Sequence, residues 1–120
     1  MLSSTVYVRV SRNLFRIRHL ESGTDATVVA SKPFTTTRLL VGQFVAASEI
    51  LKGALGQIGE GRFLALSPSV VIHPTEMVDG GLSEVEERTL QELAIAAGAR
   101  KAVVWIGREL SDSEVKERLK

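Results

Sequence analysis

The sequence predicts an α/β fold with five strands in one mixed sheet and three helices, formed by residues 1–120 as a single domain. Three observations support this prediction. Apolar and polar residues alternate through the first 30 residues, which is typical of antiparallel strands with one buried face. Residues 69–72 and 102–106 are short continuous apolar runs, which favour strands buried on both faces. The segments between and before these runs have the hydrophobic spacing of amphipathic helices.

The first three strands are expected to form an antiparallel meander. Valines alternate with polar or aromatic residues over 6–11, and a short turn at 11–13 leads to a second alternating segment over 15–19. A further turn at 21–25 is rich in residues that favour turns, and it leads to a third strand over 26–30. Short connections of this kind join neighbouring antiparallel strands, so the three strands should follow one another in the sheet.

The first helix is expected over residues 39–58, where apolar residues recur at steps of three and four. One of the threonines at 35–37 is the expected N-cap, because a threonine hydroxyl can accept a hydrogen bond from a free amide of the first turn. The helix is expected to end near Gly59 or Gly61.

The two later helices carry the same start signal. Ser83 precedes Glu86 by three residues and Ser111 precedes Glu114 by three, which is the spacing of a capping box. Gly98 is the expected stop of the second helix. The residues expected on the buried face of that helix are Val85, Leu90, Leu93, Ala94 and Ala97.

The order of elements is strand-strand-strand-helix-strand-helix-strand-helix. Right-handed crossover connections should place the two later strands parallel to the first strand, which predicts the sheet order 3-2-1-4-5. This is the order of the ribonuclease H-like fold, and actin-like ATPases are built from two such halves. A chain of 120 residues has the length of one half.

Residues 80–107 resemble a stretch of MreB, the bacterial actin homologue that organises cell shape. The resemblance rests on a strand ending in proline at 72–74, a helix start Ser-Glu-Val-Glu-Glu-Arg at 83–88, and Ala-Gly-Ala-Arg at 97–100 before an apolar strand. The first strand contains Tyr-Val-Arg at 7–9, as in short MreB-related proteins. The resemblance implies an actin-like half-domain linked to cell-shape or cytoskeletal assembly in the bacterial cytoplasm.

The turn between the first two strands departs from the actin pattern. In the actin family it carries an Asp followed by Gly and Thr, which hold the ATP phosphates and help to organise the metal. Here the turn is Ser11-Arg12-Asn13, without the glycine that allows close approach of a phosphate. It is therefore expected to be only a corner of the sheet, and no cofactor is expected. The alternative hypothesis is an anion- or nucleotide-binding protein that uses Arg12, Asn13, His73 and Thr75.

A metal-dependent nuclease of the ribonuclease H type is also disfavoured. Such an enzyme needs acids on the first strand, on the first helix and after the fourth strand to hold two metal ions. The first strand offers only Arg9 and Ser11, although Glu49 lies on the first helix and Glu76 follows the fourth strand. His73 and Glu76 lack an accompanying nucleophile, so His73 is interpreted as a hydrogen-bonded loop residue. No catalytic and no metal-binding residue is predicted.

Three arginines form the candidate interaction surface. Arg9, Arg16 and Arg18 are expected to share one face of the first hairpin, opposite the valines. Nucleic-acid binding would require aromatic residues among them, and Tyr7 is the only one. Arginine pairs well with carboxylates, so the expected partner is an acidic protein and not a nucleic acid. The alternative interpretation is a solvated face of the sheet.

Self-association is one form of this hypothesis. The acidic start of the second helix in another copy, at Glu84, Glu86 and Glu87, would supply the carboxylates. The charge distribution also allows a simpler interpretation: residues 1–62 carry eight Lys/Arg and four Asp/Glu, whereas residues 63–120 carry seven and ten, so the two parts can attract each other.

Composition and segment lengths point to a cytoplasmic location. The sequence has no cysteine, which fits a reducing compartment. No apolar run approaches the length that spans a bilayer, and the first residues lack the pattern of a signal peptide.

Overall fold

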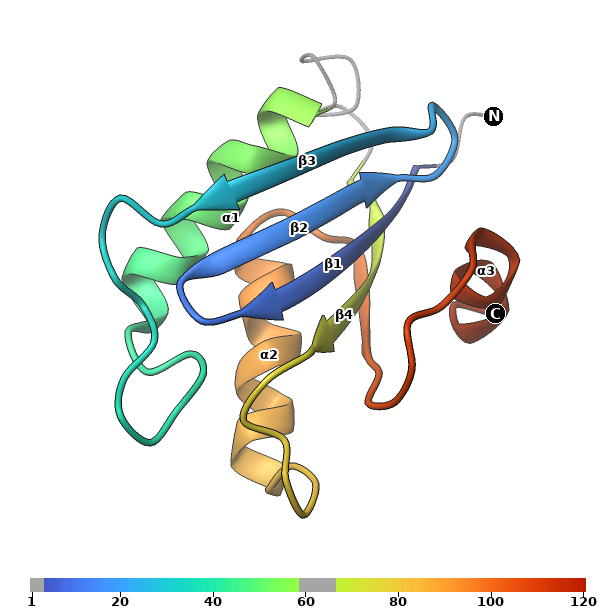
Figure 1. Ribbon diagram of the computed structural model, residues 1–120. Coiled ribbons are helices and arrows are strands. Elements are labelled where there is room, and N and C mark those ends of the chain that lie inside the picture. The colour runs from blue at the N-terminus through green and yellow to red at the C-terminus, as the bar shows by residue number, and fades with distance from the viewer. Residues whose placement is uncertain (1–3, 59–66) are drawn as a thin grey trace.

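The computed structural model describes residues 4–58 and 67–120. Helices α1 and α2 cover one face of a five-stranded sheet, while α3 near the C-terminus contacts the opposite face (Figure 1). The strands are β1 (Thr5–Ser11), β2 (Leu14–His19), β3 (Thr24–Val29), β4 (Ser69–Pro74) and β5 (Lys101–Val104). The helices are α1 (Phe44–Ile58), α2 (Glu84–Ala96) and α3 (Asp112–Arg118).

The sheet has the order β3-β2-β1-β4-β5. The pairs β1–β2 and β2–β3 are antiparallel, and β4 lies parallel to both β1 and β5. The predicted α/β class, the strand order and the three helices are therefore confirmed, and the connectivity is consistent with a ribonuclease H-like topology. Because Val10 pairs with Pro74, the carboxyl ends of β1 and β4 lie side by side.

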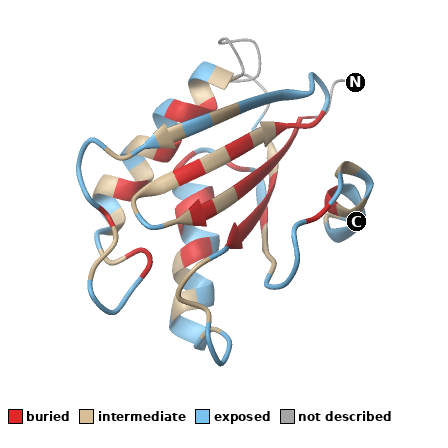
Figure 2. Ribbon diagram, viewed as in Figure 1, coloured by how far each residue is buried: buried red, intermediate tan, exposed pale blue. Residues whose placement is uncertain are grey.

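The centre of the sheet is buried on both faces, since neighbouring residues of a strand face opposite clusters. Val8 of β1 and Ile72 of β4 belong to the main core under α1 and α2. Tyr7 and Val71 belong to a smaller cluster that includes Val115 of α3. Buried residues are concentrated in β1 and β4, whereas the edge strand β3 is largely exposed (Figure 2). The apolar run at the start of β4 is thus confirmed as a doubly buried strand.

The strand boundaries differ from the expected ones by no more than two residues. The clearest difference is that β5 ends at Val104 and not at residue 106. Trp105 donates one more backbone hydrogen bond, to Ile72 at 3.0 Å. Beyond that bond the chain leaves the edge of the sheet, and Ile106 is 38% exposed.

Helix α1 begins at Phe44, so the expected start at residue 39 is wrong. The residues before it form a loop closed by its own hydrogen bonds, because the carbonyl of Phe34 accepts from the amides of Gly42 and Gln43 at 2.9 Å each. The predicted threonine N-cap is therefore wrong as well. The expected end of this helix at a glycine lies outside the described residues.

The starts of α2 and α3 are confirmed. Ser83 and Glu86 form a reciprocal capping box at the start of α2, and Ser111 and Glu114 do so at the start of α3. Of the five residues expected on the buried face of α2, four are buried and Val85 is 74% exposed. Val85 lies in the first turn, beyond the edge of the sheet, where it lines a surface pocket.

Candidate functional site

The corner at the carboxyl ends of β1 and β4 is the place where sheets of this kind bind ligands. Here Arg12 is already paired inside the protein. Its amide donates to Oε1 of Glu76 at 2.8 Å, and its Nη1 donates to Oε2 at 2.5 Å. These contacts, the backbone hydrogen bond first among them, lower the pKa of Glu76. A carboxylate of the same chain thus takes the two donors that an incoming anion would use.

Asn13 connects the turn after β1 to the loop before α1. It has a positive φ of 54°, which asparagine tolerates better than most residues. Its side-chain Oδ1 accepts from the backbone amides of Phe34 and Thr35 at 2.8 Å each. Its backbone amide donates to Oγ1 of Thr35 at 2.9 Å. Asn13 therefore holds two segments of the chain together, which accounts for the residue type without a ligand.

Thr75 is bonded back to β1. Its amide and its hydroxyl both donate to the carbonyl of Val10, at 2.8 and 3.1 Å. The side chains of Arg12, Asn13 and Thr75 are thus directed to three different partners, Glu76, the loop before α1, and β1. The structure brings these three residues to one corner of the sheet, but it engages each of them separately.

His73 lies inside β4, so the interpretation as a loop residue is wrong, although its hydrogen bonding is confirmed. It is 3% exposed and faces the side of the sheet away from the main core. Its Nδ1 is 2.6 Å from the hydroxyl of Tyr7, and its Nε2 is 2.9 Å from the carbonyl of Gly107. The hydrogen-bond partners of His73 are thus different from those of Arg12, Asn13 and Thr75, so His73 does not form one site with them.

The hydrogen bonds around His73 assign its protonation. The carbonyl of Gly107 can only accept, so Nε2 carries the proton of the neutral ring and donates it to that carbonyl. Nδ1 is then the acceptor, so the Tyr7 hydroxyl donates to Nδ1, while the Tyr7 oxygen accepts from the amide of Leu110 at 3.1 Å. Burial lowers the pKa of His73 and raises the pKa of Tyr7, which keeps both side chains neutral. This network, the Tyr7–His73 network, fastens residues 107–110 to the sheet.

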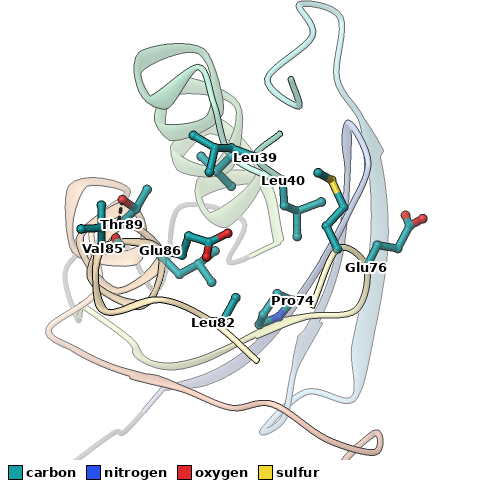
Figure 3. Close-up of a pocket in the computed structure, with 11 residues that line it drawn as sticks. Leu39, Leu40, Pro74, Glu76, Leu82, Val85, Glu86 and Thr89 are labelled. Atoms are coloured by element: carbon teal, nitrogen blue, oxygen red, sulfur yellow. Dashed lines mark hydrogen bonds between the residues drawn. The ribbon is translucent and has the colours of Figure 1, made fainter. Parts of the chain in front are cut away.

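A small apolar cavity lies at the same carboxyl-end corner (Figure 3). Its volume is about 50 Å³, whereas pockets for drug-sized ligands have about 300–1,000 Å³. The residues that line it include Leu39, Leu40, Pro74, Met77, Leu82 and Val85. Size and lining both disfavour a nucleotide at this position.

The three arginines share one face of the hairpin, as expected, and this set is called the arginine face. In the antiparallel register of β1 and β2, Arg9 lies opposite Arg16, and Tyr7 lies opposite Arg18. The valines of β1 lie in the main core on the opposite face. Figure 1 places α3 and the chain before it beside this part of the sheet.

Each arginine of this face contacts a carboxylate of the same chain. Glu109 Oε1 lies 3.1 Å from Arg9 Nη1 and 3.7 Å from Arg16 Nη2. Arg18 donates to both oxygens of Asp112, at 2.8 and 3.1 Å, and to Asp25 at 2.9 Å. The hydrogen bonds that Asp112 accepts from Arg18 are the main cause of the lowered pKa of Asp112.

Sequence reasoning missed two groups of residues here. The sequence presents Tyr7 only as an aromatic residue among the arginines, and it does not identify Glu109 and Asp112 as their partners. The excess of acids in the second part of the sequence was the signal that pointed to such pairs. It could not identify which acids would reach the sheet, because their position depends on how the chain leaves β5.

Residues 4–58 and 67–120 contain no group of three or more His, Cys, Asp or Glu side chains arranged to hold a metal ion. Within the same residues, no helix combines the length and hydrophobicity that a membrane span requires.

No protein-family model matches the chain. The chain is 34% identical over 103 residues to a protein of Escherichia coli (strain K12) described as uncharacterized protein YjaA. The match covers 82% of this chain and 80% of that protein.

Proposed function

This chain belongs to the same family as YjaA of Escherichia coli, and from that premise and the geometry of its site we propose that it is a non-catalytic interaction module. It acts in the cytoplasm as an actin-like half-domain that binds a protein partner. The resemblance of residues 80–107 to MreB supports a link to cell-shape or cytoskeletal assembly. Fold alone is a weak warrant for function, so the proposal depends on the site.

The contact between Arg12 and Glu76 is the observation that carries the proposal. In actin-like proteins the turn after the first strand holds phosphate, whereas here its amide and its cation both bind an internal carboxylate. A phosphate at this position would lie against the charge of Glu76 unless that side chain moved away. The apolar cavity of about 50 Å³ beside this turn offers no room for the rest of a nucleotide.

The first test is thermal melting with and without Mg²⁺-ATP. We expect no shift of the melting temperature, because Glu76 already occupies the donors of Arg12. If ATP did bind, a concentration of 100 times its dissociation constant would add about 2.7 kcal/mol of stability, which the experiment would detect. We also expect no ATP hydrolysis above background. A stabilisation by ATP that disappears in Arg12→Gln and Thr75→Ala would instead support the alternative nucleotide site at Arg12, Asn13, His73 and Thr75.

The second test addresses the partner. Among the three arginines, Arg16 has the most exposed side chain, at 43% against 12% for Arg9 and 29% for Arg18. We expect Arg16→Ser to lose a host protein that co-purifies with the parent chain, because a guanidinium is a strong donor to partner carboxylates. The matched control is Arg88→Ser on α2, where the side chain is 79% exposed. Equal retention of every co-purified protein by the three chains would contradict the proposal for this face.

A further inference from the structure

The C-terminal segment, residues 111–120, covers part of the arginine face in the manner of a bound peptide. Asp112, the first residue of α3, receives two hydrogen bonds from Arg18. Val115, one helical turn later, is fully buried in the cluster formed with Tyr7, Leu20 and Val71. A charged contact and an apolar contact, three residues apart, therefore hold the first turns of α3 against the sheet.

We infer that residues 111–120 are an internal ligand that masks a docking surface, and that the external ligand of this surface is an acidic amphipathic helix of a partner protein. This inference rests on the proposed interaction role and gives its partner a chemistry. The partner helix has an acid in its first turn to pair with Arg18 and an apolar residue three positions later to replace Val115. Charge complementarity to Arg18 selects an acidic helix over a basic or neutral one.

The contacts that hold α3 are few compared with those of the main core. Among the described residues, the cluster under α3 has five buried members, of which only Val115 belongs to residues 111–120, whereas the main core has twenty buried members. The carboxylate of Asp112 belongs to a side chain that is 47% exposed, and exposed ion pairs contribute little to stability. Arg118 over the Trp105 ring at 4.1 Å and Lys101 bonded to the Leu119 carbonyl at 2.6 Å also lie at the surface.

The point at which α3 separates is defined by the Tyr7–His73 network. Residues 107–110 are fastened to the sheet by buried hydrogen bonds to Tyr7 and His73. Glu109 therefore stays near Arg9 when α3 leaves, and the exposed surface consists of Arg18 and the apolar patch of Leu20 and Val71. Local opening of such a lightly packed end costs less free energy than global unfolding.

The experiment supplies the masking helix from outside. An acetylated, fluorescently labelled peptide of residues 111–120 is titrated against the full chain and against Val115→Asp, which places a charge in the apolar patch and displaces α3. We expect the peptide to bind Val115→Asp at least tenfold more tightly than the parent chain, because the surface of the parent is open only in a fraction of molecules. Adding Arg18→Gln to Val115→Asp should weaken binding about two- to fivefold, the size of effect that an exposed ion pair supports.

The matched control is Val45→Asp on α1, where the valine is 67% exposed and lies away from α3. This variant should bind the peptide as weakly as the parent chain. Equal binding to Val115→Asp and Val45→Asp would overturn the inference, as would binding that Arg18→Gln leaves unchanged. A parent chain that sediments as a dimer with exchanged C-terminal helices would also overturn it, since the ligand would then be a second copy.

Hydrogen exchange on the unaltered chain gives an independent readout. The amide of Val115, bonded to Ser111 at 2.9 Å, should exchange at least tenfold faster than that of Leu93 in the core of α2, because α3 opens without the rest of the molecule. Equal protection of the two amides would show that α3 does not open separately and would overturn the inference. The two experiments test the two hypotheses separately. If the peptide does not bind Val115→Asp, the masking hypothesis is wrong, but the absence of an ATP effect still stands. If ATP raises the melting temperature, the proposed function is wrong, whatever the peptide does.

Discussion

Asn13→Ala is expected to lower the free energy of unfolding by about 2–4 kcal/mol, because it leaves two backbone donors without their acceptor at about 1–3 kcal/mol each. Oδ1 of Asn13 accepts from the amides of Phe34 and Thr35 at 2.8 Å, and both contacts are only partly accessible to water. Alanine would also have to adopt the φ of 54°, which is unfavourable for a residue with Cβ. Urea denaturation with an unchanged m-value measures the loss.

Two control variants separate the causes of this loss. Asn13→Asp keeps an acceptor at the same place and tolerates the positive φ, so it should be the least destabilising. Asn13→Gly keeps the backbone conformation but loses the acceptor, so it should lie between Asp and Ala. If Asn13→Asp were as destabilising as Asn13→Ala, the hydrogen bonds to the loop before α1 would not be the reason for this residue.

Tyr7→Phe is expected to lower the free energy of unfolding by about 1–3 kcal/mol, the cost of leaving buried polar groups unsatisfied. The Tyr7 hydroxyl accepts from the amide of Leu110 and donates to Nδ1 of His73. Tyr7 is 2% exposed and His73 is 3% exposed, so water cannot readily replace the missing oxygen. A stability equal to that of the parent chain in urea would show that the Tyr7–His73 network does not hold residues 107–110.

The same network predicts how stability depends on pH. The pKa of His73 is lower in the folded chain than its ordinary value of 6.5, chiefly because burial penalises the charged form. The unfolded chain therefore binds more protons, and stability decreases as the pH falls from about 6.5 through the folded-state pKa. His73→Gln, which retains one acceptor and one donor, should remove this part of the acid dependence. A parallel pH profile for the two chains would assign the dependence to other groups.

The local elements could be predicted because their signals lie within a few residues of one another. Each capping box joins a serine to a glutamate three residues away, and both boxes are present at Ser83 and Ser111. Alternation over β1 and β2 determined which side chains face the main core, and it correctly grouped the arginines on the other face. The order of these elements and the handedness of crossover connections then led to the sheet order.

The start of α1 could not be read from its hydrophobic spacing. The loop before it is held by Asn13, whose hydrogen-bond partners lie 21 and 22 residues along the chain. Those bonds favour a compact loop over further helical turns, and a periodicity argument considers only neighbours along the chain. The misplacement of Val85 has a related origin, because the first turn of α2 extends beyond the sheet that would have covered it.

By itself, the sequence determined the fold class, the order of the strands and the faces of the sheet, because these follow from short-range patterns of polarity and from general rules of connection. Only the tertiary structure decided what the polar side chains do. Arg18 meets Asp112 across 94 residues, and Tyr7 meets His73 across 66. Such pairs depend on which strands become neighbours and on how the chain crosses the sheet after β5. Polar contacts are short and directional, so their partners are decided only when distant segments are brought together.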